Sequence, residues 1–253
     1  MPDHNTAVSC IITMPLTFFY PFLRIKGGEI LTRIQTYHKH PRRRFPIRPT
    51  KRGWAVLAIL LAVIILLVSR CTHRQPEAIY PENIGTIPVH TDLIPEDFAG
   101  RTGIERDIKW IVIHETGNRA PSATAANHNA FLHDDKQRES KTAWHYTVDD
   151  HEIYHHLPDD EVGYQAGDGQ AKNGGNLCGI GIEICVNEGG DYDQAVDNAA
   201  MLTAYLLNAY HLGVNDVKQH ADFMQKNCPE HLREGDNWTH FLQKVKEYKK
   251  QLK

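Results

Sequence analysis

The feature that most constrains this chain is an uninterrupted apolar run from Trp54 to Val68 that contains no charged residue. With Gly53 and Ser69 the run reaches 17 residues, which is the lower limit for a membrane-spanning helix. At 1.5 Å per residue such a helix is roughly 25 Å long, slightly shorter than a ~30 Å hydrocarbon core. The run has no polar face, so a buried core helix explains it poorly. We therefore expect one transmembrane helix over residues 54–70, in contact with the lipid bilayer.

Charge is distributed unevenly on the two sides of this run. Residues 1–70 carry 11 Lys and Arg against 2 acidic residues, whereas residues 71–253 carry 17 against 29. Net charges of +9 and −12 therefore add up to the formal charge of −3. Because basic residues stay on the cytoplasmic side of a membrane helix, residues 1–53 are expected to form a cytoplasmic tail and the rest to lie outside. The acidic part gives no indication of nucleic-acid binding.

The residues after the apolar run bear on whether this segment is cleaved from the mature protein. A signal-peptidase site has small residues in an A-x-A pattern, which Ser69-Arg70-Cys71 fits poorly. Lipid attachment to Cys71 is disfavoured because Arg70 stands where that motif has a small residue. An uncleaved anchor is the favoured interpretation, with a cleaved signal, and hence a secreted protein, or a lipid-modified Cys71 as the alternatives.

Beyond the apolar run the pattern changes from proline-containing to periodic. Residues 71–91 hold Pro76, Pro81 and Pro88 without sustained periodicity and are expected to be an extended linker. From residue 92 onward, strand patterns mix with helix patterns, which predicts an α/β domain over residues 92–253. The expected strands are 110–113, 144–148 and 179–186, and the expected helices are 122–134, 194–211 and 237–252.

The third of these strands alternates clearly between apolar and other residues. Ile182 and its neighbours two positions away point to one face, and Glu183 points to the other. On that second face Gly181 and Cys185 are small, which leaves open space above the sheet. A carboxylate in such a place pairs with a cation or acts as a base; the alternative is an exposed Glu on an edge strand.

Three other residues, far apart along the chain, are candidate zinc ligands. His114 ends the buried strand, His220 lies near the start of a loop, and Cys228 follows eight residues later, before a proline. Imidazole nitrogen and thiolate sulfur both bind zinc well, and three protein ligands plus a water are typical of catalytic zinc. The spacing alone is weak evidence, because a single His or Cys in these places is more often structural. Lys226 is a candidate cation near the same metal or an ordinary solvated lysine.

Five short segments of the domain occur in an order and at spacings that match a known family. They are Ile111–Asn118, Trp144–Asp150, Ala166–Gly169, Ile180–Asn187 and Gln219–Pro229. Jointly they resemble the zinc-dependent type-2 N-acetylmuramoyl-L-alanine amidases, which include phage endolysins and are similar to peptidoglycan-recognition proteins. The resemblance covers about residues 92–240 and neither the apolar run nor the basic tail.

The resemblance implies both a fold and a set of site residues. The fold would be a single mixed β-sheet flanked by helices, as in peptidoglycan-recognition proteins. His114, His220 and Cys228 would hold one zinc ion. Glu183 would be the catalytic carboxylate, and Lys226 would assist it electrostatically.

The resemblance also implies a substrate, peptidoglycan, and a reaction. Zinc-activated water would cleave the amide bond between N-acetylmuramic acid and the L-alanine of the stem peptide. His145 resembles a position near the metal, and we expect it to contact substrate together with Asp168. Close relatives usually have Trp or Tyr followed by His where this chain has Tyr164-Gln165. Because Gln cannot titrate as His does, the resemblance does not predict how this loop contacts the substrate.

Two other functions compete with the enzyme. Related recognition proteins bind peptidoglycan without cutting it, but such members typically lack the metal-binding Cys, and Cys228 is present here. A membrane-tethered scaffold with structural zinc would need a fourth protein ligand. We therefore expect a bacterial, single-pass protein of the cytoplasmic membrane whose catalytic domain lies outside, in the periplasm or cell wall.

Overall fold

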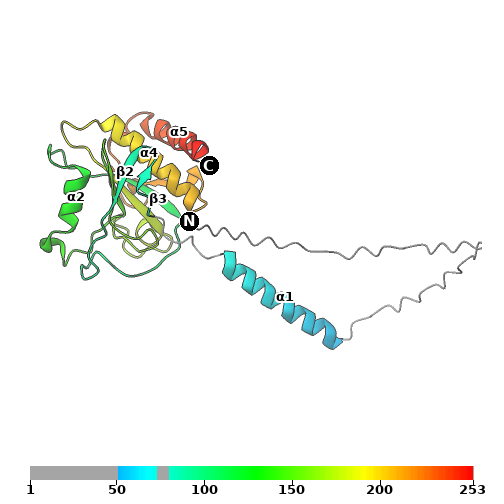
Figure 1. The fold of residues 1–253 in the computed structure, drawn as a ribbon. Helices are drawn as coiled ribbons and strands as arrows, with labels where there is room; N and C mark the ends of the chain where they lie inside the picture. The colour runs from blue at the N-terminus through cyan, green and yellow to red at the C-terminus, as the bar shows by residue number, and fades with distance from the viewer. Residues whose placement is uncertain (1–50, 73–79, 253) are drawn as a thin grey trace, which may run out of the picture. The chain divides into compact units, whose positions relative to one another are not determined.

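The computed structural model describes residues 51–72 and 80–252. The chain divides into two units, residues 1–56 and residues 57–253, and the boundary falls inside helix α1 (Lys51–Thr72). The helix covers the whole apolar run (Figure 1). The predicted helical state of residues 54–70 is therefore confirmed, whereas nearly all of the expected basic tail lies outside the described residues.

The transmembrane character expected of this helix is not supported. Within residues 51–72 and 80–252, no helix is both long enough and apolar enough to cross a bilayer. The predicted lipid partner is accordingly not supported either.

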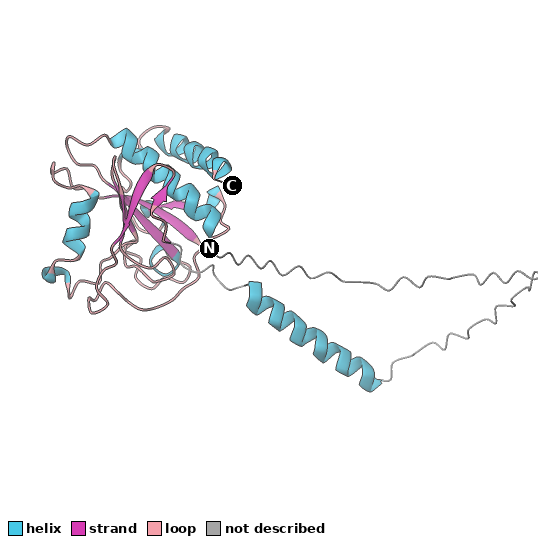
Figure 2. Ribbon diagram, in the orientation of Figure 1, coloured by secondary structure: helices cyan, strands magenta, loops and turns pink. Residues whose placement is uncertain are grey.

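A single mixed β-sheet with helices on its faces forms the centre of the second unit, as predicted (Figure 2). Its strand order is β1-β2-β5-β4-β6-β3-β7, and β6 is parallel to both β3 and β4. β7 is parallel to β3, whereas β5 runs antiparallel to β4. The strands are β1 (Asn83–Ile84), β2 (Ile87–Thr91), β3 (Trp110–Glu115), β4 (Tyr146–Val148), β5 (Ile153–His155), β6 (Gly179–Ile184) and β7 (Val217–Gln219). The helices are α2 (Ala125–Leu132), α3 (Gly175–Cys178), α4 (Tyr192–Ala209) and α5 (Asn237–Gln251).

The core lies on the face of the sheet that α4 and α5 cover. Ile180, Ile182 and Ile184 are fully buried there, which confirms the predicted alternation of β6. Leu206 of α4 and Phe241 of α5 belong to the same apolar cluster. Burying each such side chain contributes about 1.5–3 kcal/mol, so this face anchors the sheet and leaves the opposite face of β6 for polar residues.

The register of the parallel strands brings the predicted site residues together. His114 of β3 pairs directly with Glu183 of β6, and Glu183 in turn pairs with Thr147 of β4. On the other side of β3, Ile113 pairs with Gln219, the last residue of β7. Because parallel strands end at the same edge of a sheet, the residues that follow β3 and β7 meet there.

The sheet also extends into part of the predicted linker. Residues 87–91 form β2, which pairs in parallel with β5, and Ile87 and Val89 are buried. The prolines that suggested a linker are tolerated because Pro88 pairs only with the two-residue strand β1. Helix α2 begins later than the expected residue 122, because Thr124 caps it by accepting a hydrogen bond from the backbone N–H of Asn127.

Candidate metal centre

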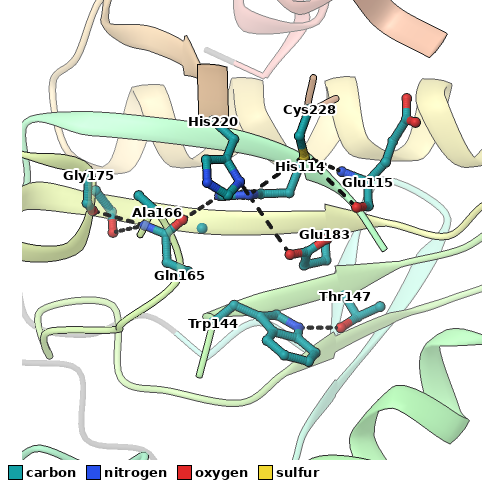
Figure 3. Close-up of polar contacts among 12 residues, drawn as sticks. His114, Glu115, Trp144, Thr147, Gln165, Ala166, Gly175, Glu183, His220 and Cys228 are labelled. Carbon is teal, nitrogen blue, oxygen red and sulfur yellow. Dashed lines mark hydrogen bonds and ion pairs between the residues drawn. The ribbon is translucent and has the colours of Figure 1, made fainter. Parts of the chain in front are cut away.

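Three buried side chains meet at the carboxyl ends of β3 and β7 (Figure 3). His114 comes from β3, His220 begins the short 3₁₀ helix η3 (His220–Asp222) directly after β7, and Cys228 comes from the following loop. The Nδ1 atoms of the two histidines are 2.9 Å apart, and Sγ of Cys228 lies 4.0 Å from Nδ1 of His114. The structure thus brings together the three residues that the sequence proposed as ligands.

Burial keeps both histidines neutral at pH 7. Burial, with a smaller contribution from the adjacent His220, lowers the pKa of His114 to about 3. Burial and the charge of Lys226 also lower the pKa of His220. A neutral imidazole has a free lone pair, so both rings can donate to a cation.

The pKa of the Cys228 thiol is shifted in the opposite direction, upward. Burial raises its pKa to about 11, and the backbone N–H of Glu115, which donates to Sγ over 3.4 Å, partly offsets this. A metal ion would therefore have to displace the thiol proton in order to bind sulfur at neutral pH.

The donor set of these residues fits one zinc ion. Two imidazole nitrogens and one sulfur are ordinary zinc ligands, and the group contains three residues rather than four among those that the structure describes. The buried Nε2 of His220 and Oε2 of Glu183 have no hydrogen-bond partner within the described part of the chain. Three ligands leave one coordination position open, as in catalytic rather than structural zinc sites.

Glu183 lies beside this group. Its Oε1 is 3.9 Å from Nδ1 of His114, and its side chain is 16% exposed. Burial raises the pKa of Glu183 to about 7, while the charge of Lys226 acts in the opposite direction. A carboxyl group that titrates near neutrality can both accept and release a proton there.

Lys226 is an exposed residue of the loop that carries Cys228. Its backbone carbonyl accepts a hydrogen bond from the N–H of Cys228 over 2.9 Å. Its positive charge lowers the pKa of Glu183. Lys226, Cys228 and Thr116 line a cavity of about 200 Å³ that offers room for a substrate group.

The two residues expected to contact substrate serve the fold in this structure. His145 is completely buried; its Nδ1 accepts from the N–H of Gly181 and its Nε2 lies 3.0 Å from the carbonyl oxygen of Glu161. The carboxylate of Asp168 accepts from the N–H of Gly175 over 2.6 Å and from that of Asn176 over 3.2 Å. Their contact with substrate stays a prediction.

Two residues at the site were not predicted from the sequence as contributors. Glu115 directly follows the ligand His114, and its buried carboxylate accepts hydrogen bonds from Tyr192 and His231. Gln165 contacts His114 and fills the space above Gly181 that the sequence suggested was open. The only signals in the sequence were the position of Glu115 next to a ligand and the departure of Gln165 from the family pattern.

Comparison with known proteins agrees with this geometry. The profile of the Amidase_2 family, N-acetylmuramoyl-L-alanine amidase, matches residues 104–231, half of the chain. The amidase CwlH of Bacillus subtilis (strain 168) is 40% identical over 157 residues, which are 62% of this chain and 60% of CwlH. The amidase XlyA of the same organism is 40% identical over 150 residues, 59% of this chain and 48% of XlyA. The chain thus spans about half to three fifths of the length of these relatives.

Solved structures match the same part of the chain. The catalytic domain of XlyA superposes with a TM-score of 0.58 at 37% identity and covers 63% of this chain and 99% of that domain. The PlyG catalytic domain superposes with a TM-score of 0.57 at 28% identity, over 64% of this chain and 96% of that domain. The fold, the placement of the ligand trio and the match over residues 104–231 agree, and the chain belongs to the Amidase_2 family of N-acetylmuramoyl-L-alanine amidases.

Proposed function

We propose that this protein is a zinc-dependent peptidoglycan hydrolase that cleaves the amide bond between N-acetylmuramic acid and L-alanine. The observation that carries the proposal is the position of Glu183, whose carboxylate lies 3.9 Å from Nδ1 of His114 at the edge of the ligand group. A structural metal site needs no carboxylate of raised pKa beside it, whereas hydrolysis needs a proton acceptor there. The names of the relatives support the substrate.

The chemistry divides among the ligands and two other residues. A zinc ion held by His114, His220 and Cys228 would lower the pKa of a water and polarise the substrate carbonyl. The carboxylate of Glu183 accepts a proton from the attacking water and delivers it to the leaving nitrogen, as the C–O bond forms and the C–N bond breaks. The ammonium group of Lys226 stabilises the negative charge that develops on the carbonyl oxygen.

The surroundings of the site have room for an extended substrate. A second cavity, of about 320 Å³, is lined by Thr116, Asn127, Phe131 and Trp144. Thr116 lines this cavity and also the one beside Lys226, so the two adjoin at that residue. A glycan with a peptide branch extends on both sides of its amide bond, and two adjoining cavities suit such a ligand.

Purified peptidoglycan sacculi test the proposal. The protein should release stem peptides with a new L-alanine amino terminus, and a zinc chelator should abolish the release until zinc is restored. Binding to sacculi without release of peptides would instead favour the non-catalytic binding module. Release that a chelator does not affect would contradict the role of zinc.

We further propose that the catalytic domain acts outside the cytoplasmic membrane of a bacterium, where peptidoglycan lies. The names of the relatives, which are N-acetylmuramoyl-L-alanine amidases, support this location, because the substrate of such an enzyme lies there. Protease added to intact spheroplasts should degrade the domain. Full protection until the spheroplasts are lysed would contradict the proposal.

A further inference from the structure

The side chain of Gln165 is buried against the ligand His114. Its Oε1 contacts Nε2 of His114, whereas the other ring nitrogen, Nδ1, faces His220 (Figure 3). Its Nε2 donates to the carbonyl oxygen of Gly175 over 2.9 Å and lies 3.5 Å from that of Gly179. Gln165 therefore bridges a metal ligand to the backbone of α3 and β6.

These contacts determine which way the amide points. The carbonyl oxygens of Gly175 and Gly179 can only accept, so the NH₂ group of Gln165 must face them. The amide oxygen is left facing His114, and an oxygen acceptor requires Nε2 of His114 to carry the ring proton. The other ring nitrogen, Nδ1, then has its lone pair free and directed at His220, 2.9 Å away.

The loop around Gln165 holds this side chain in place. Oδ1 of Asn176 accepts from the N–H of Gln165 over 2.8 Å and from that of Ala166 over 2.6 Å. Gly181 makes the space for the amide, since a Cβ at Gly181 would lie 2.8 Å from Oε1 of Gln165. Asn176 therefore fixes the backbone of Gln165, and Gly181 of β6 leaves the space that its side chain occupies.

We propose that Gln165 is a positioning residue that selects the tautomer of His114, so that Nδ1 is the atom offered to the metal. Outer-shell partners of this kind fix the orientation and tautomer of a ligand histidine, and losing one typically weakens metal binding 10- to 100-fold. An amide cannot ionise, so the acceptor that Gln165 offers to His114 does not change with pH. The inference rests on the proposed zinc site.

Substitution of Gln165 tests its positioning role through zinc affinity, a measurement that does not depend on hydrolysis. Gln165→Met keeps the length of the side chain and removes both the acceptor and the donor. In Gln165→His a neutral imidazole again offers one acceptor and one donor, so it should act as a rescue. Gln170→Met is the matched control, because Gln170 is exposed on the same loop and its amide donates a hydrogen bond to the hydroxyl of Tyr164, not to a proposed metal ligand.

Zinc affinity, measured by competition with a chelating dye, should fall roughly 10- to 100-fold in Gln165→Met. It should stay within about threefold of the wild type in Gln165→His and Gln170→Met. Equal affinity in Gln165→Met and the wild type would overturn the inference while leaving the proposed function intact. A wild-type protein that binds no zinc would instead contradict the proposed function.

The tautomer can be read directly, even if Gln165→Met does not fold. In ¹⁵N-histidine-labelled, metal-free wild-type protein, the ring signals of His114, assigned by comparison with His114→Gln, should show a proton on Nε2. A proton on Nδ1 would overturn the inference, whatever zinc binding or hydrolysis show. The folded Gln165→Met variant should lose the preference for the Nε2 proton.

Discussion

The carboxylate of Glu183 lies 3.9 Å from Nδ1 of His114 because β3 and β6 pair these two residues directly across the sheet. One residue is a candidate metal ligand and the other a candidate base, so a single register of parallel strands sets their separation. A slip of one residue in either strand would turn one of the two side chains to the opposite face. The chemistry of the site thus depends on the pairing that the buried isoleucines of β6 enforce.

Glu183→Gln should separate zinc binding from hydrolysis. The amide keeps the size and most hydrogen bonding of the carboxylate but cannot accept a proton from water. We expect the rate of peptide release from sacculi to fall about 10²- to 10⁴-fold, with zinc content unchanged. Steady-state release and metal analysis on the same sample check this. Hydrolysis at the wild-type rate would remove Glu183 from the mechanism.

The same substitution should change the pH dependence of stability in the metal-free protein. Burial raises the pKa of Glu183 from 4.5 to about 7 in the folded state. Protonated Glu183 is therefore compatible with the fold below pH 4.5, and stability is lost as pH rises through 7, by up to roughly 3 kcal/mol. Gln does not ionise, so in the presence of chelator the Tm of Glu183→Gln should exceed that of the wild type at pH 8 by more than at pH 5. An equal difference at both pH values would show that Glu183 does not titrate in this range.

Much of this site could be predicted from the sequence because its residues lie next to strong local signals. His114 ends the buried apolar strand, Glu183 lies in the alternating strand, and Cys228 precedes a proline. The alternation of residues along β6 is enough to predict that Glu183 points away from the buried isoleucines. The family resemblance then indicated that these residues, which are far apart along the chain, belong to one site.

Two kinds of feature could not be predicted from the sequence: contacts between residues far apart along the chain, and very short strands. β5 and β7 have three residues each, too few to show a period. The small side chain of Gly181 suggested open space, but only the folded loop shows that Gln165 fills it. The burial of His145 likewise depends on a hydrogen bond from the backbone of β6, which no local pattern encodes.

Glu115 should matter for zinc binding although it is not a ligand. Its carboxylate accepts from Tyr192 over 2.6 Å and from Nδ1 of His231 over 2.8 Å, which joins β3 to the segment just after Cys228. Glu115→Ala leaves these partly buried donors unpaired and should lower the free energy of unfolding by about 1–3 kcal/mol. We also expect weaker zinc binding, because the loop that carries Cys228 loses this connection.

Thermal unfolding of the metal-free protein and zinc competition measure the two effects of Glu115→Ala. Glu230→Ala is the control, because Glu230 is exposed in the same loop. The control should change neither quantity appreciably. If Glu115→Ala lowers Tm but binds zinc as the wild type does, the carboxylate stabilises the fold without positioning Cys228.

Zinc affinity should depend on pH through Cys228. Burial raises the pKa of this thiol to about 11, so the metal-free protein holds the thiol proton throughout pH 6–8 and must release it when zinc binds. Burial lowers the pKa of both His114 and His220, which favours the neutral rings that bind zinc. The zinc association constant should therefore rise at least about tenfold for each pH unit between 6 and 8, with at least one proton released per ion. Calorimetry in buffers of different ionisation enthalpy measures the number of protons released.

In Cys228→Ser, zinc binding should weaken severely and the metal content after purification should fall. A variant that keeps a full complement of zinc, or an affinity that does not change with pH, would exclude Cys228 as a ligand.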